Sequence, residues 1–114
     1  MLRVSLEPLL LAETSPGTFS LLLRDLDSFS PSFEAAGHSG NGYSWEAVAR
    51  HVLESSLPEA EERVEFDSEA DMFCAHGADR EALEQLGTIV ADAARSPKRL
   101  AKLIATVPPA LWDD

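Results

Sequence analysis

Two short segments near the start of the chain alternate between apolar and polar residues, the period of a half-buried β-strand. The alternation runs through residues 2–12 and again through residues 19–23. Between them lies a turn with Pro16 followed by Gly17, a pair suited to the middle of a type II turn. We therefore predict a β-hairpin whose first strand lies at an edge or is bulged, because Pro8 removes one backbone donor.

Residues 25–42 show no clear period and are rich in Ser and Gly. They predict a long loop, and its two phenylalanines are expected to dock on the body of the protein. An apolar stripe at helical spacing follows from Trp45 onward. Ser44 is the expected N-cap of this helix, and Pro58 is expected to end it.

The second half of the chain predicts two more strands and two more helices. The strands are expected at residues 61–67 and 71–76, and the helices over residues 80–95 and from Pro97 to Pro108. Asp79 and Ser96 are their expected N-caps. The order β-β-α-β-β-α-α indicates one α+β domain over residues 1–114. It has a small antiparallel sheet of about four strands and three helices packed on one face.

The charge balance is strongly acidic. Nine Lys and Arg face twenty Asp and Glu, which gives a formal net charge of −11. Such a charge repels nucleic acid and anionic lipid and attracts basic proteins or cations, so we expect neither a nucleic-acid nor a membrane partner. The N-terminus lacks the pattern of a signal peptide, and a cytoplasmic location is therefore expected.

Seven carboxylates fall within thirteen residues, with only Arg63 among them to oppose their charge. Two interpretations stay open: a solvated outer face, or an electrostatic surface for a basic partner. Like charges crowded on one strand face cost stability, which favours the second interpretation. The candidate partner-binding residues are Glu61, Glu62, Glu65, Asp67, Glu69 and Asp71.

Motifs of catalysis and metal binding are missing from the sequence. There is no Gly-x-Ser-x-Gly elbow, and His38, His51 and His76 have no metal-ligand spacing. The glycine-rich run before the first predicted helix lacks the Lys-Ser/Thr ending of a phosphate-binding loop. Cys74 lies in an apolar run and is expected to be buried. We therefore predict no catalytic residue, no metal site and no cofactor.

Tyr43 and Trp45 flank the start of the first predicted helix. Aromatic residues at such positions more often belong to the core, or staple the helix start, than act as binding hot spots. We therefore expect Trp45 to be buried.

Two stretches of the chain carry a family likeness. One is GNGYSW, from Gly40 to Trp45, and the other is FDSEADMF, from Phe66 to Phe73, followed by the helix that Asp79 caps. Together they resemble the immunity protein 51 family of bacterial polymorphic toxin systems. The resemblance implies a protein that neutralises a cognate toxin by direct binding in the producing cell. It implies no cofactor and no catalytic residue, and it assigns no toxin-contacting residues.

The leading hypothesis is thus an inhibitor that occludes a cognate toxin, and a basic toxin would match its charge. Two other classes stay open. One is a non-enzymatic ligand-binding or adaptor domain that uses the long loop and the sheet as a cleft. The other is a small hydrolase built on the acidic residues, for which no motif is present.

Overall fold

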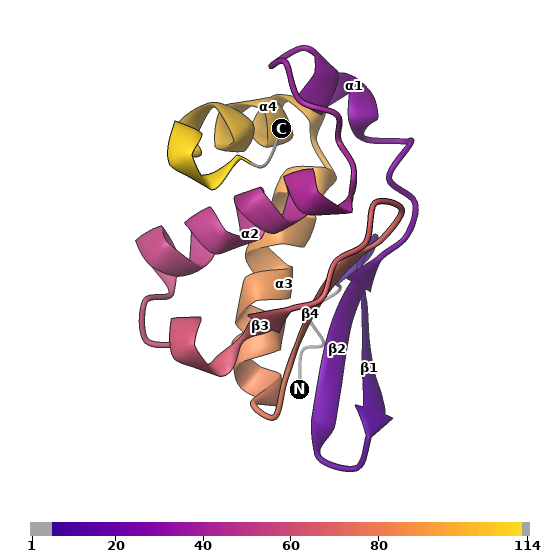
Figure 1. Ribbon diagram of the computed structural model, residues 1–114, viewed down its shortest axis with the longest axis vertical. Coiled ribbons are helices and arrows are strands. Elements are labelled where there is room, and N and C mark those ends of the chain that lie inside the picture. The colour runs from indigo at the N-terminus through magenta and orange to yellow at the C-terminus, as the bar shows by residue number, and fades with distance from the viewer. Residues whose placement is uncertain (1–5, 113–114) are drawn as a thin grey trace.

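Four strands form one antiparallel sheet in the order β1-β2-β4-β3 in the computed structural model, which describes residues 6–112. The strands are β1 (Leu10–Ser15), β2 (Thr18–Leu23), β3 (Glu65–Phe66) and β4 (Phe73–Gly77). The helices are α1 (Ser30–Glu34), α2 (Gly42–Ser56), α3 (Arg80–Ala94) and α4 (Pro97–Thr106), with short 3-10 helices η1 (Glu61–Arg63) and η2 (Pro109–Leu111). This arrangement confirms the predicted α+β class and the order of strands and long helices (Figure 1).

Helices α2 and α3 pack on the sheet, and their contact with it forms the core. Leu21 and Phe73 of the sheet are fully buried, as are Trp45 of α2 and Leu83 of α3. Helix α4 packs against α3 and α1 at one end of the molecule (Figure 1). The apolar stripes predicted from 3.6-residue periodicity are therefore the faces that these helices bury.

The first strand was predicted over residues 2–12, and this placement is wrong for residues 6–9. These residues form a turn in which the Leu9 N–H donates to the Leu6 carbonyl at 2.7 Å, and β1 starts only at Leu10. Pro8 has no N–H to give to a ladder, so a turn suits it better than a strand interior. Residues 2–5 of the predicted strand lie outside the described residues.

The third strand was predicted over residues 61–67, and it is far shorter. Glu61–Arg63 is the 3-10 helix η1, in which the Arg63 N–H donates to the Ala60 carbonyl at 2.9 Å. Only Glu65–Phe66 pairs with β4. Two buried residues, Ala60 and Val64, hold this turn against the body of the protein. The fourth strand starts at Phe73 rather than residue 71, because the chain is still turning at that point.

The N-cap of α2 is Asn41, not Ser44 as predicted. The Asn41 Oδ1 accepts from the Ser44 N–H at 2.9 Å, so the helix begins at Gly42. The Ser44 hydroxyl is buried and accepts from the Gly40 N–H at 3.1 Å. The caps of the other two long helices are confirmed, since the side chains of Asp79 and Ser96 each accept a backbone N–H of the first turn.

The predicted docking of the 25–42 segment is confirmed, and the segment contains α1. Phe33 is fully buried, and its ring centroid lies 5.1 Å from that of Trp45 in an edge-to-face contact. Phe29 makes a second such contact with Trp45 at 5.6 Å. Trp45 itself is 0 % exposed, as predicted. At the C-terminal end, Trp112 stacks on His38 with 3.6 Å between ring centroids.

Candidate functional site

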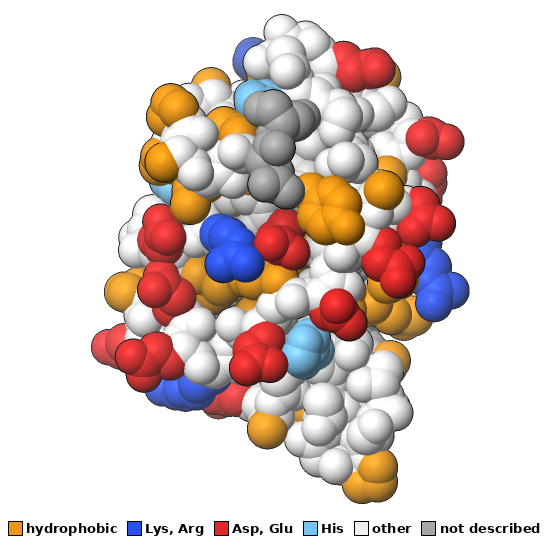
Figure 2. Space-filling model, viewed as in Figure 1, with side chains coloured by type: hydrophobic (Ala, Val, Ile, Leu, Met, Phe, Trp, Pro, Cys, Tyr) orange, Lys and Arg blue, Asp and Glu red, His pale blue; other side chains and the backbone are white. Residues whose placement is uncertain are grey.

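All six carboxylates singled out from the sequence are exposed, and they follow one continuous segment that we call the acidic strip. Glu61 and Glu62 belong to η1, Glu65 to β3, Asp67 follows β3, and Glu69 and Asp71 belong to the turn between β3 and β4. Figure 2 shows acidic side chains spread across the middle of this face, where α2, β3 and β4 lie in Figure 1. The structure therefore spreads the six along the segment from η1 to the turn before β4.

The middle of the acidic strip lies on the sheet face that points away from α2 and α3. Glu65 is paired with His76 across the ladder, and their side chains approach to 4.0 Å. His76 is in turn opposite Ser20 of β2. Asp67 extends the hairpin by donating its N–H to the Cys74 carbonyl at 3.0 Å. Cys74 is buried as predicted, and desolvation raises the pKa of its thiol.

The far end of the acidic strip is a tight turn, which we call the hairpin tip (residues 69–72). The Glu69 N–H donates to the Met72 carbonyl at 2.8 Å, and the Met72 N–H donates back at 3.2 Å. The first residue of α2 packs directly on this tip, where the Gly42 N–H donates to the Ala70 carbonyl at 3.0 Å. The two stretches that carry the family likeness thus meet in space.

Gly42 leaves no room for a side chain. A Cβ at this position would lie 1.9 Å from the Glu69 carbonyl oxygen and 2.3 Å from that of Met72. Both atoms belong to backbone that is itself hydrogen-bonded, so they cannot turn aside as a flexible side chain could. The glycine is therefore required by the contact between α2 and the hairpin tip.

We expect Gly42→Ala to lower the free energy of unfolding by about 3 kcal/mol, the upper end of the usual cost of overpacking. Urea denaturation followed by circular dichroism measures it. Gly37→Ala is the control: Gly37 has a φ of +89° and no atom within 4 Å of an added Cβ. That variant should lose only the cost of a left-handed residue, about 1–2 kcal/mol. Equal losses in the two variants would contradict the close-contact argument.

Arg63 is the only Lys or Arg in residues 59–71, and its guanidinium pairs with a carboxylate outside this stretch. The Arg63 guanidinium donates to the Asp79 carboxylate at 2.7 Å, which is 16 residues further along the chain. This hydrogen bond, with that from the Ala82 N–H, holds the pKa of Asp79 below its ordinary value.

On α2, Arg50 pairs with Glu46 at 3.1 Å and lies 4.7 Å from the centroid of the Phe66 ring.

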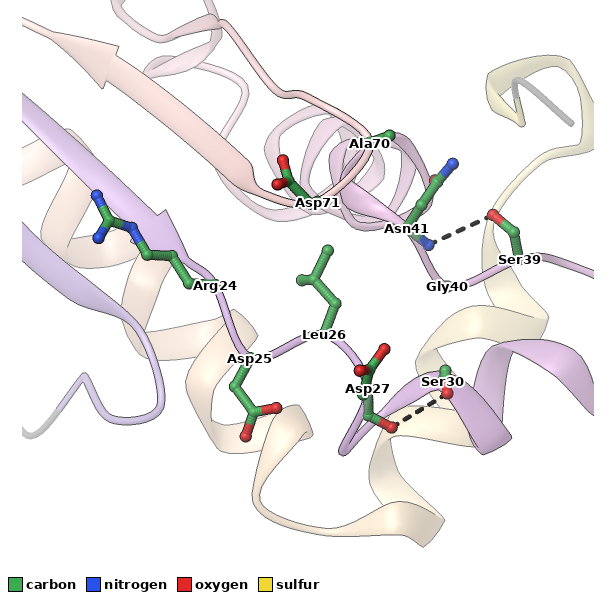
Figure 3. Close-up of a pocket in the computed structure, with 10 residues that line it drawn as sticks. All are labelled: Arg24, Asp25, Leu26, Asp27, Ser30, Ser39, Gly40, Asn41, Ala70 and Asp71. Atoms are coloured by element: carbon green, nitrogen blue, oxygen red, sulfur yellow. Dashed lines mark hydrogen bonds between the residues drawn. The ribbon is translucent and has the colours of Figure 1, made fainter.

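A cleft opens beside the hairpin tip, between the 25–42 segment and the β3–β4 turn, in keeping with the ligand-binding alternative that placed a cleft between the long loop and the sheet (Figure 3). It has a volume of about 290 Å³ and is walled by residues 24–27 with Ser30, residues 39–41, and residues 70–71. Three carboxylates line it, those of Asp25, Asp27 and Asp71, and Arg24 is the only cation among the lining residues. Asp25 and Asp27 lie in a segment without apolar periodicity. The only sequence signal for them is their place directly after the predicted second strand.

Tyr43 departs from its expected core role. Its side chain is 39 % exposed, whereas that of Trp45 two residues later is buried. The first turn of α2 therefore presents an aromatic ring to solvent next to the residue that contacts the hairpin tip.

Across residues 6–112, no group of three or more His, Cys, Asp and Glu side chains is arranged to hold a metal ion. None of the helices described there is long and apolar enough to cross a membrane.

The fold and its surface define a small α+β domain with an exposed acidic strip. The immunity protein 51 family model matches residues 9–108, nearly the whole chain. The chain therefore belongs to the immunity protein 51 family, and the resemblance seen in its two motifs is confirmed. Comparison with curated proteins and with solved structures found no match.

Proposed function

We propose that the chain neutralises a cognate bacterial toxin by binding it directly and covering a surface that the toxin needs. The observation that carries the proposal is the family match over residues 9–108. In this proposal the chain catalyses no reaction, uses no cofactor and acts in the cytoplasm of the cell that makes the toxin. Inhibition then depends only on the fraction of toxin molecules to which the chain is bound.

The acidic strip is the proposed contact surface, and its charge supports a basic toxin as the partner. The chain carries a net charge of −11, and the strip concentrates six of its carboxylates on exposed positions. One exposed ion pair is worth only about 0–1 kcal/mol. Several matched charges together steer association and set the orientation of the complex. The strip is therefore expected to act as a whole rather than through one dominant residue.

Tyr43 supplies the apolar contact that charges alone do not provide. Binding hot spots are enriched in tyrosine, tryptophan and arginine. Tyr43 follows Gly42, whose N–H is bonded to the Ala70 carbonyl at 3.0 Å, so its backbone is fixed relative to the hairpin tip. A partner that covers the tip would also cover the mouth of the cleft at Asp71.

A ligand-binding or adaptor role is the second candidate, and the cleft is the observation in its favour. Its polar walls suit a small cationic group better than an apolar one. In that case the chain would bind a small molecule and leave the activity of the toxin unchanged.

The test is a titration, with the purified chain, of the toxin domain that a pull-down from the native host identifies as its partner. We expect toxin activity to fall linearly and to reach its minimum at a fixed stoichiometry, because each bound chain occupies one toxin. Complete inhibition at strongly substoichiometric amounts would show turnover and contradict the non-catalytic proposal. A toxin that keeps its activity at excess chain would contradict the immunity function itself.

A further inference from the structure

Resting on the proposed function, we propose that Arg63 is a positioning residue for toxin binding, which acts by holding η1 to the start of α3 through Asp79. Arg63 carries a positive charge within an acidic surface, so charge alone predicts that it weakens the attraction of a basic toxin. The geometry points to the opposite net effect. Arg63 contributes to binding by fixing the place of the carboxylates next to it.

The pair joins the two ends of the β3–β4 hairpin. Arg63 is the last residue of η1, just before β3, and Asp79 is the N-cap of α3, just after β4. Their side-chain atoms lie 2.7 Å apart. Glu61 and Glu62 occupy the other two positions of η1, so the pair sets where these two carboxylates stand relative to the rest of the acidic strip.

A close backbone contact between β4 and η1 also holds these two segments together. A Cβ on Gly77, the last residue of β4, would lie 2.4 Å from the Arg63 carbonyl oxygen. Any other residue at position 77 would push η1 away from the strand. On its inner side η1 is held by the buried residues Ala60 and Val64. The turn is therefore fixed through its flanking residues and through Arg63 itself.

The hydrogen bond with Asp79 also removes the Arg63 charge from the neighbouring carboxylates. Asp79 is the principal charge partner of Arg63, with Glu59 and Glu81 contributing less. An untethered guanidinium could instead pair with Glu61, Glu62 or Glu65, which are close along the chain. Such pairing would neutralise part of the acidic strip before the toxin arrives.

The energy of the pair fits a positioning role better than a stabilising one. The side chain of Arg63 is 57 % exposed and that of Asp79 is 29 % exposed. Exposed ion pairs contribute little to folding, because water and salt screen them. Holding a binding surface in its bound geometry nevertheless lowers the ordering cost of association, and this benefit appears mainly in the dissociation rate.

The experiment compares Arg63→Gln with Arg80→Gln against the same toxin domain, by surface plasmon resonance. Both variants remove one positive charge, and both residues are exposed arginines in an ion pair, since Arg80 pairs with Glu84 at 2.9 Å. We expect Arg63→Gln to dissociate about three- to fivefold faster than the wild type, although it is more negative, because the gain from holding η1 in place cannot exceed the strength of the exposed pair. Arg80→Gln should dissociate within about twofold of the wild type.

Hydrogen exchange separates positioning from general loss of structure. In Arg63→Gln, the amides of residues 61–67 should exchange faster, while the core amides of α2 and the melting temperature stay as in the wild type. Asp79→Ser retains a capping side chain but lacks the carboxylate, and it should reproduce the faster dissociation.

Two results would overturn the inference while leaving the proposed function intact. One is an Arg63→Gln variant that binds the toxin as tightly as Arg80→Gln, or more tightly than the wild type. The other is faster dissociation without any change in exchange at residues 61–67. If the wild-type chain itself fails to bind the toxin, the proposed function fails first.

Discussion

Replacing Trp45 with alanine is expected to lower the free energy of unfolding by about 3–5 kcal/mol, the range for losing a large buried aromatic side chain. Trp45 is 0 % exposed and contacts the rings of Phe29 and Phe33 edge to face. Its loss would open a cavity between α2 and α1. Small domains have only about 5–15 kcal/mol of stability in total. Urea denaturation followed by circular dichroism measures the change.

Trp45→Phe is the matched variant for this site. It keeps an aromatic ring against Phe29 and Phe33 but removes the indole nitrogen. That Nε1 is buried without a hydrogen-bond partner among the described residues, so its removal carries no lost bond. We therefore expect the phenylalanine variant to lose less stability than the alanine variant. An alanine variant that keeps its denaturation midpoint and loses toxin binding would instead place Trp45 at the interface.

Reversing four charges of the acidic strip is expected to abolish protection against the toxin while leaving the fold intact. The variant carries lysine at Glu61, Glu62, Glu65 and Asp67, all of which are exposed. Each reversal replaces an attraction for a basic toxin with a repulsion, and the four reversals together are expected to cost about a few kcal/mol of binding free energy. Single reversals should be mild, because each exposed pair contributes only about 0–1 kcal/mol. Cell survival during toxin expression and toxin pull-down measure the loss.

The control variant changes the net charge by the same amount at exposed sites outside the acidic strip, with lysine at Glu7, Glu34, Glu54 and Asp92. It should retain protection, and both variants should keep the circular dichroism spectrum of the wild type. The association rate of the wild type should fall steeply with salt, whereas the four-lysine strip variant should lose this dependence. Full protection by the strip variant would move the contact surface elsewhere, with the 28–42 segment as the next place to test.

Much of the fold follows from local pattern, because helix caps and apolar periodicity act within a few residues of each other. The caps Asp79 and Ser96 and the buried faces of α3 and α4 are as the sequence predicts. Strand β2 and the burial of Trp45 are predicted equally well. The acidity of residues 59–71, and with it the sign of the partner's charge in our proposal, is visible in the sequence alone.

Where two local solutions compete, tertiary contacts decide between them. Asn41 and Ser44 can each cap α2, and Asn41 takes that role with Gly42 packed against the hairpin tip. The alternation after Pro58 reads as a strand, because the apolar residues Val64 and Phe66 recur at every second position. The chain turns there instead, since η1 has to join the end of α2 to β3 over a few residues.

The arrangement of the candidate site is the part that only the tertiary structure decides. The sequence determines which carboxylates exist and that Arg63 lies among them. It contains nothing that directs Arg63 to Asp79, 16 residues away, or brings residues 24–27 to the hairpin tip beside α2. The physical reason is the distance along the chain over which each kind of interaction acts. Capping and periodicity are set by neighbours along the chain, whereas ion pairs and clefts depend on where packing places whole elements.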